Sequence, residues 1–351
     1  MDIYILDGPN GVKDIIDTFQ SVIWTMQYSG LGDFELVLPG TAENVRRLPK
    51  GALLVREEDA QDDYFTNVMR VESRRLDFEV DTGWTLTVTG KSLKSILRQR
   101  VIWTQYNHTG NLEDGIRQVV EDNAVSPSDP DRAIPNLYLD APYGDTTTAD
   151  FQVMGENLGD WVADTCGANN LGWDIYIMGG QFLFTIYKGT DHTYDGVDPV
   201  VFSPEYDNLL TATYEEDGEN YANCAVIGGE GEGTSQRIAH AGSGVGLDRW
   251  ETYIDGSSVS SNGEIITLQT YLSMLKTYGE TELAKLKNSE KFSGQVEQNN
   301  MFILGVDYDL GDLVQIDNGI ISAQSRVTEI IYAEDESGFS LVPTFGTWED
   351  D

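Results

Sequence analysis

Apolar and polar residues alternate in short bursts along the first hundred positions, and turn residues separate the bursts. "DIYILD" leads into "GPNG", "DFELVLP" ends at Pro39, and "GALLVRE", "YFTNVMRVESRRL" and "WTLTVTG" follow. Short strands at regular spacing with few helices are typical of a small barrel or sandwich. We therefore predict a first β-barrel domain over residues 1–105, with brief helices at "TAENVRRL" and "KSLKSILRQR".

The period of the apolar positions changes near Tyr106. Leu112, Ile116, Val119 and Val120 fall on one face of a helix, and "ENLGDWVADTCGANN" repeats that spacing. "GWDIYIM" and "QFLFTIYKG" flank two adjacent glycines that suit a two-residue hairpin turn. The pattern predicts an α+β insert domain over residues 106–200.

Strand patterns return after residue 200. "LTATYEEDGENYANCAVIGG" is predicted to form a hairpin and "RWETYID" a strand, and "TLQTYLSMLKTYGETELAKLKN" is the longest helix candidate. We predict a second β-barrel domain from 201–255 and 290–351, with a helical insertion at 256–289. The expected fold class is α+β and β-rich, with two small β-barrel domains interleaved with α+β segments.

Charge is the most unusual feature of the composition. The 351 residues include 59 Asp and Glu against 22 Lys and Arg, a formal charge of -37, whereas 40% are hydrophobic. That apolar fraction excludes a disordered chain, and the negative field argues against sequence-specific DNA binding and against binding to anionic membranes. Three interpretations of the charge stay open: plain solubility, adaptation to high salt, or the wall of a conduit through which DNA slides.

The N-terminal stretch "MDIYILDGPNGVKDI" lacks the features of a signal peptide, and apolar runs stay well short of the roughly 20 residues of a membrane span. We predict no membrane segment and synthesis in the cytoplasm. The two cysteines, Cys166 and Cys224, are too few for a disulfide framework. Both are expected to be small buried hydrophobes.

A glycine-rich stretch, "CAVIGGEGEGTSQRI", resembles a phosphate-binding loop at first sight. Such a loop needs glycines that let backbone N–H groups reach the anion, followed by a helix. Here Glu230 and Glu232 would repel a phosphate, and the continuation shows no helical spacing. The interpretation is a mobile acidic loop free to contact a neighbour.

Other candidate chemistry is equally sparse. The histidines, His108, His192 and His240, are far apart in sequence, and "HAGSGVG" has Ala241 where a nucleophile elbow around Ser243 needs glycine. The carboxylates in "DHTYDGVD" and "DYDLGD" have turn spacing, and an EF-hand beginning at the first run would place Phe202 where glutamate is required. We predict no catalytic, cofactor-binding or metal-binding residues and no cofactor.

Two further groups have ordinary structural interpretations. The clusters Glu215-Glu216-Asp217 and Glu334-Asp335-Glu336 are predicted at hairpin turns. The tryptophans fall on alternating strand positions or a helix face, which predicts core packing rather than stacking platforms for sugars or bases; they are Trp24, Trp84, Trp103, Trp161, Trp173, Trp250 and Trp348.

Longer stretches, taken in order, resemble the tail-tip hub proteins of long-tailed bacteriophages, the siphophage tail-associated family related to baseplate hubs. The resemblance covers nearly the whole chain; its stretches are "SVIWTMQYSGLGDFELVLP", "GKSLKSILRQRVIW", "FSPEYDNLLTATYEEDGENYANCAVIGGEGEG", "GLDRWETYIDGSSVS", "DYDLGDLVQI" and "RVTEIIYAEDESGFSLVPTFGT". Many relatives continue into a hydrolase or fibre region, whereas this chain ends shortly after "LVPTFGT".

The resemblance implies two small barrels per subunit and a homotrimeric ring with pseudo-sixfold symmetry. It implies a structural, non-enzymatic protein of the virion tail tip, with the tail tube, a distal tail protein and fibre or receptor-binding proteins as partners. Genomic DNA would pass through the lumen. The alternatives are a tail-tip cell-wall or glycan-active enzyme, a carbohydrate-binding module, and a cellular acidic protein from a salt-loving organism.

Overall fold

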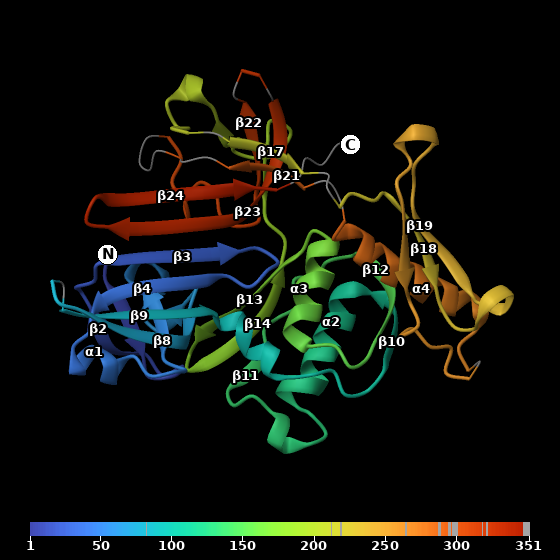
Figure 1. Ribbon diagram of the computed structural model, residues 1–351, viewed down its shortest axis with the longest axis horizontal. Helices are drawn as coiled ribbons and strands as arrows, with labels where there is room; N and C mark the ends of the chain where they lie inside the picture. Colours follow the sequence, from blue (N-terminus) through green and yellow to red (C-terminus); the bar gives the residue numbers. More distant parts are fainter. Residues whose placement is uncertain are drawn as a thin grey trace.

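One large sheet dominates the computed structural model (Figure 1), which describes residues 1–81, 83–211, 213–217, 220–263, 265–286, 289–293, 296, 301–317, 319–320 and 322–346. Its strand order is β17-β21-β24-β23-β3-β4-β9-β8-β5-β1-β2, and β22 branches from β23 to pair with β15 and β16. The strands are β1 (Ile3–Leu6), β2 (Val12–Ile16), β3 (Ser21–Gln27), β4 (Asp33–Pro39), β5 (Leu53–Arg56), β8 (Met69–Glu79), β9 (Gly83–Ser92), β15 (Asp191–His192), β16 (Val201–Phe202), β17 (Thr213–Asp217), β21 (Ser289–Ser293), β22 (Leu313–Asp317), β23 (Ser322–Asp335) and β24 (Gly338–Phe345).

The ladder between β3 and β23 joins the two ends of the chain. The strands pair antiparallel from Ser21–Asp335 to Gln27–Glu329, and Trp24 of β3 lies in one hydrophobic core with side chains from both chain ends. The β-rich α+β class is confirmed. The described strands form no closed barrel, because the strand order ends at β2 and β17. The strands of the two expected barrels instead belong to one sheet, since β3 and β23 pair with each other.

The middle of the chain forms a second core beside this sheet. It contains the five-stranded sheet β11-β14-β13-β7-β6, the β10–β12 pair and two helices. Gly179 and Gly180 both have positive φ, which confirms the predicted two-residue turn between β13 and β14. The elements are β6 (Ala60–Gln61), β7 (Tyr64–Phe65), β10 (Tyr106–Asn111), α2 (Leu112–Val120), β11 (Leu137–Leu139), β12 (Thr148–Val153), α3 (Leu158–Ala168), β13 (Gly172–Met178) and β14 (Gln181–Tyr187).

A third core lies between the sheet β19-β18-β20 and helix α4. Gly279 lets the helix approach closely, since a Cβ there would lie 2.3 Å from the Ile227 side chain. The predicted long helix is confirmed, whereas the predicted hairpin of β17 with β18 is wrong: β17 pairs with β21, and β18 turns its apolar residues to α4. The elements are β18 (Cys224–Gly228), β19 (Ile238–Gly242), β20 (Glu251–Asp255) and α4 (Leu268–Ala284).

Short helices and loops complete the fold. The brief helices predicted in the first hundred residues are confirmed as α1 (Ala42–Arg47) and a 3₁₀ helix (Leu93–Gln99). Glu334–Glu336 lies at the β23–β24 turn as predicted, but Glu215–Asp217 lies inside β17 rather than at a turn. No helix of the described residues is long and apolar enough to cross a membrane. The division near residues 105, 200, 255 and 290 stays a prediction.

Burial separates the tryptophans into two groups. Trp24, Trp161 and Trp173 are buried as predicted, and so are both cysteines. The core prediction is wrong for three others, which are more than half exposed: Trp84, Trp103 and Trp250. Trp348 lies outside the described residues. Exposed aromatics therefore mark surfaces that the alternating pattern alone did not distinguish from core.

Candidate functional site

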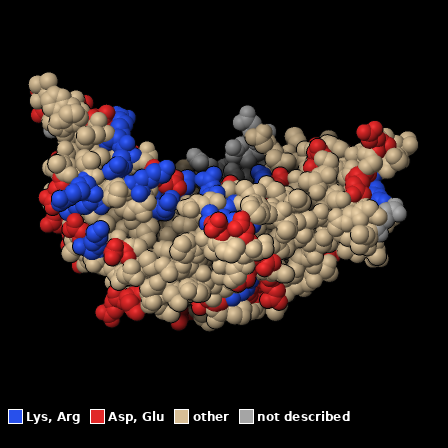
Figure 2. Space-filling model, turned by 90° about the horizontal axis from the view of Figure 1, so that it is seen from below, with Lys and Arg blue, Asp and Glu red and all other residues tan. Residues whose placement is uncertain are grey.

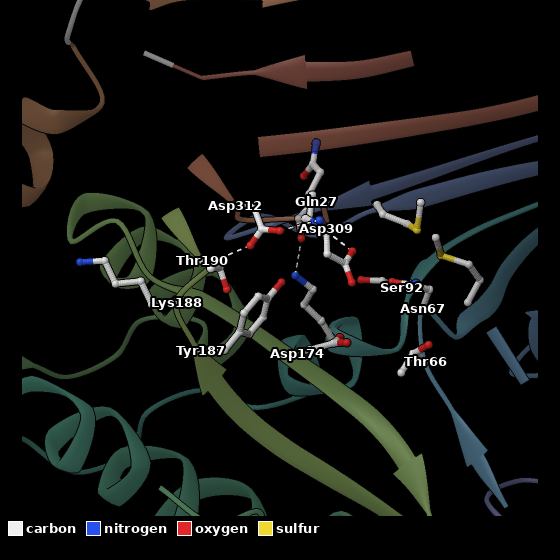
Figure 3. A pocket seen from close by; sticks show the side chains of 15 residues that line it. Gln27, Thr66, Asn67, Ser92, Asp174, Tyr187, Lys188, Thr190, Asp309 and Asp312 are labelled. Atoms are coloured by element: carbon white, nitrogen blue, oxygen red, sulfur yellow. Dashed lines mark hydrogen bonds between the residues drawn. The ribbon is translucent and has the colours of Figure 1, made fainter. Parts of the chain in front are cut away.

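A polar cavity lies where the large sheet meets the middle of the chain (Figure 3). Its volume is about 290 Å³, and residues from five strands (β3, β8, β9, β13 and β14), the 3₁₀ helix and three loops line it. At its wall, the Lys94 ammonium is buried, donates to the Gln27 carbonyl at 2.6 Å and to the Tyr28 carbonyl at 3.3 Å, and lies 5.1 Å from the Trp173 ring centre. One buried cation therefore ties the end of β3 to the middle core.

Carboxylates surround the same cavity. Desolvation raises the pKa of Asp174, an effect that Lys94 partly opposes, and desolvation at the cavity wall also raises the pKa of the more exposed Asp309. Asp312 accepts from the Thr190 N–H and from the Asp309 N–H, both at 2.6 Å. These bonds make the "DYDLGD" run a tight turn, in agreement with the turn interpretation. Across the described residues, no group of three or more His, Cys, Asp and Glu side chains is placed to hold a metal ion.

We expect Lys94→Met to change how stability depends on pH. Burial lowers the pKa of Lys94 to about 8, whereas an unfolded lysine has a pKa of about 10.4. Between these values the unfolded chain binds more protons, so wild-type stability rises with pH; below about pH 8 both states are protonated and this contribution is flat. The variant should lack a rise of about 2 kcal/mol between about pH 8 and about pH 10.

Urea unfolding at several pH values measures this difference. Lys50→Met is the matched control, because Lys50 is exposed; its stability should follow the wild-type slope. An unchanged slope in Lys94→Met would show that the ammonium of Lys94 is not the group that titrates.

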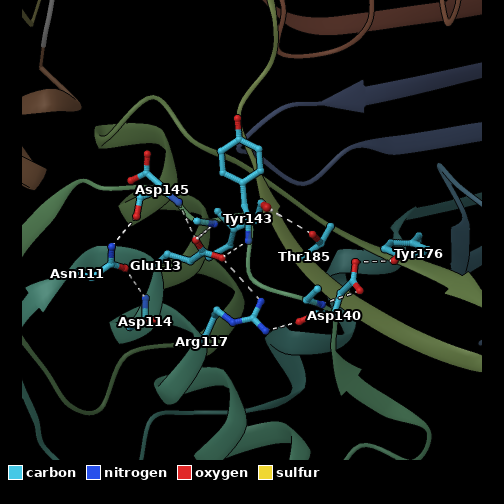
Figure 4. Close-up of polar contacts among 12 residues, drawn as sticks. Asn111, Glu113, Asp114, Arg117, Asp140, Tyr143, Asp145, Tyr176 and Thr185 are labelled. Atoms are coloured by element: carbon cyan, nitrogen blue, oxygen red, sulfur yellow. Dashed lines mark hydrogen bonds and ion pairs between the residues drawn. The ribbon is translucent and has the colours of Figure 1, made fainter.

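A second polar centre holds the loop before β12 against helix α2 (Figure 4). The Glu113 side chain is 2% exposed, and its carboxylate accepts from the N–H groups of Tyr143, Gly144 and Asp145 at 2.7, 2.8 and 3.0 Å. The Arg117 guanidinium lies 3.9 Å from Glu113 and donates to the Asp140 carbonyl. This arrangement satisfies a buried carboxylate with backbone donors and a cation, as a structural anchor requires.

The glycine-rich stretch has a fixed first half. The Glu230 carboxylate accepts from the Ser261 N–H and hydroxyl, both at 2.7 Å, and from Ser260, while Arg237 lies 3.2 Å away. The hydrogen bonds from Ser261 are the main reason that the pKa of Glu230 is lowered. The expectation of a free loop is therefore wrong at Glu230, because its carboxylate links β18 to the segment before α4.

The three histidines occupy separate sites. His108 stacks on Phe151 with ring centres 4.9 Å apart and contacts the Asn111 carbonyl, whereas His192 contacts the Val197 carbonyl at 2.8 Å. His240 lies in β19. His192 also lies 3.7 Å from the Asp312 carboxylate of the cavity wall, whereas His108 and His240 lie on β10 and β19, so the histidines do not converge.

Charge is distributed unevenly over the molecule. Residues 1–105 hold 12 of the Lys and Arg against 16 Asp and Glu, whereas residues 106–351 hold 10 against 43. Figure 2 shows the Lys and Arg gathered at its left end, over the N-terminal strands, and a surface hollowed along its upper side. The acidity that dominates the composition therefore belongs mostly to the later part of the chain.

Sequence patterns did not identify the two buried polar centres. Lys94 lies in "KSLKSIL", where the spacing fits any short surface helix, and Glu113 follows the apolar Leu112 at a helix start, where acidic residues are common. Their burial depends on β13 and on the loop before β12, which are distant in sequence. A charged residue between apolar positions was the only available signal.

Three known proteins with the same fold are phage tail proteins. The tail protein from Neisseria meningitidis MC58 superimposes with a TM-score of 0.61 at 11% identity, covering 98% of this chain and 96% of its own. The 43 kDa tail protein of prophage MuSo2 from Shewanella oneidensis gives 0.60 at 12%, covering 98% of each chain. The prophage tail protein gp18 from Listeria monocytogenes EGD-e gives 0.56 at 11%, covering 100% and 96%.

Sequence comparison gives the family. No curated protein matches the chain. The family model described as Siphovirus ReqiPepy6 Gp37-like protein matches residues 2–347, nearly the full length. The predicted resemblance to siphophage proteins is thereby confirmed, and the chain belongs to the family of Siphovirus ReqiPepy6 Gp37-like proteins.

Proposed function

We propose that this protein is a structural hub at the tip of a phage tail. Three copies form a ring that joins the tail tube and a distal tail protein to fibres or a receptor-binding device. The family and the tail-protein fold over 98% of the chain carry the proposal. The large sheet supports it further, because a ladder through both chain ends ties the N-terminal and C-terminal strands into one sheet, as a load-bearing ring requires.

A structural role fits the polar centres of the molecule. Lys94 and Glu113 are satisfied by backbone groups and neighbouring charges, and they tie segments together. Neither centre offers an aligned nucleophile and base, which acyl-transfer or hydrolytic chemistry needs. We therefore assign assembly, and not catalysis, as the function.

A nonsense mutation in the gene tests the hub proposal. Without the protein, particles should have incomplete tails, and a plasmid copy should restore infectivity. Antibody against the protein should label the tail tip in electron micrographs, and averaged images of the tip should have threefold symmetry. Complete, infectious tails that lack the protein would overturn the proposal.

We further propose that carboxylates of the later part of the chain face the lumen of the ring. DNA passes a wall of like charge without being retained, and a trimer multiplies the charge of -37 per subunit. The electrostatic potential at the lumen wall, mapped on a structure of the assembled ring, tests this proposal. A neutral or basic lumen would assign the acidity to the outer surface instead.

A further inference from the structure

One end of the large sheet carries an exposed mixture of basic and apolar side chains. The basic end face consists of Val12, Lys13 and Ile15 on β2 and Arg46 and Lys50 in or just after α1. All five are exposed, and Val12 and Ile15 are 47% and 44% exposed, unusual values for branched apolar residues on a strand. Within the described part of the sheet, β2 pairs only with β1 and is an edge strand. An edge with apolar side chains is a ready site for another chain.

Two arginines strengthen the positive charge of this face. Arg47 donates to the Ile15 carbonyl at 3.0 Å, and Arg74 of β8 donates to the Val45 carbonyl at 2.8 Å. These bonds hold α1 against β2 and β8, so the cations have fixed positions. Asp14 lies 3.8 Å from Arg47 and neutralises only part of the charge.

A side branch of the same sheet is acidic. The acidic end face consists of Tyr194, Asp195, Val197, Asp198 and Tyr206, all exposed. They lie in and after the loop between β15 and β16, which both pair with β22. Tyr194 and Val197 are 56% and 59% exposed. The chain has no Lys or Arg between Lys188 and Arg237, so this face keeps its negative charge.

The two faces lie on different parts of one sheet. β2 is an end of the strand order, whereas β22 with β15 and β16 forms a side branch at β23, several strands away from β2. In Figure 1, α1 and β2 lie at the lower left and β22 at the top. Each face combines exposed apolar area with a prevailing charge, and the prevailing signs of the two faces are opposite.

We propose that the basic end face docks on the acidic end face of a second copy of this chain. Copies with a charge of -37 each repel one another, and a contact between them requires local opposite charge. Because the two faces differ, the contact is heterologous and repeats head to tail, and it closes into a ring when the rotation per subunit permits. The inference rests on the proposed ring and adds the surfaces that form it.

A nucleic acid is the less suitable occupant of the basic end face. Acidic residues, Asp14 and Glu43, interrupt the cations, and the field of the whole chain repels phosphates. The acidic end face of another copy offers both the opposite charge and apolar side chains for Val12 and Ile15. One chain therefore supplies both halves of the contact.

Charge reversal and rescue test the contact. Sedimentation velocity is run on the full chain at about 0.15 M salt, where the Debye length is about 8 Å and charges in contact still interact. Wild type should associate, and Arg46→Glu/Lys50→Glu should weaken association at least about tenfold, which corresponds to about 1.4 kcal/mol. Adding Asp195→Arg/Asp198→Arg to that variant should restore association to within about threefold, because the opposite charges are exchanged.

The control changes the same net charge elsewhere. Arg75→Glu/Lys276→Glu alters two exposed residues with side-chain exposures of 78% and 55%, outside both faces; it should associate like wild type. Association of Arg46→Glu/Lys50→Glu at wild-type strength would overturn the docking while leaving the hub proposal intact. The docking would also be overturned if the wild type stayed monomeric and bound purified tail tubes, while Arg46→Glu/Lys50→Glu did not bind them. That result would assign the basic end face to another tail protein. The threefold symmetry of the tail tip in virions, by contrast, tests the hub proposal itself.

Discussion

Glu113→Ala is expected to destabilise the protein by about 3 kcal/mol. The substitution removes the acceptor of three backbone N–H groups, those of Tyr143, Gly144 and Asp145. It also leaves the Arg117 guanidinium, whose side chain is 12% exposed, without the carboxylate beside it. An unpaired buried cation costs more than the pair contributes, which makes the single truncation more harmful than removal of both groups.

Urea unfolding measures the loss, and hydrogen exchange locates it. The amides of Tyr143 to Asp145 should lose protection first, since water replaces the carboxylate. Asp114→Ala is the matched control, because Asp114 is the next residue of the same helix and is exposed; its loss should stay below about 1 kcal/mol. Equal losses of stability in the two variants would show that Glu113 stabilises the protein only as a negative charge in the first turn of the helix.

The local elements were predictable because each has a short-range signal. The helices α2 and α4 follow from apolar spacing, and the β13–β14 turn follows from Gly179-Gly180, since φ is positive at both residues. The family resemblance was visible for a similar reason, because its stretches keep their order along nearly the whole chain. Such features depend on neighbours within a few residues.

Long-range pairing was not predictable from the same patterns. β17 alternates like half of a hairpin, yet its partner is β21, about seventy positions later. The β3–β23 ladder joins strands roughly three hundred residues apart, and neither strand encodes its partner. The choice depends on which edges the packed cores bring together. The same limit hides Lys94, whose burial requires β13.

Trp24→Ala is expected to have the largest effect on stability, about 3 to 5 kcal/mol. The indole is fully buried, its Nε1 donates to the Asn67 carbonyl at 3.2 Å, and its ring centre lies 5.5 Å from that of Phe34. Trp24 pairs with Tyr332 across the β3–β23 ladder. Removing it therefore leaves a cavity at the junction between the two ends of the chain, where both sides lose contacts.

The matched control is Trp84→Ala, which removes the same side chain from a strand of the same sheet. Trp84 is 52% exposed, so its loss should cost less than about 1 kcal/mol. Urea unfolding of Trp24→Ala should give a single transition, and hydrogen exchange should show β3 and β23 losing protection together, because one ladder and one core include both. If β23 kept its protection while β3 and β4 lost theirs, the two chain ends would be independent units, and the shared core would not be what makes each subunit rigid.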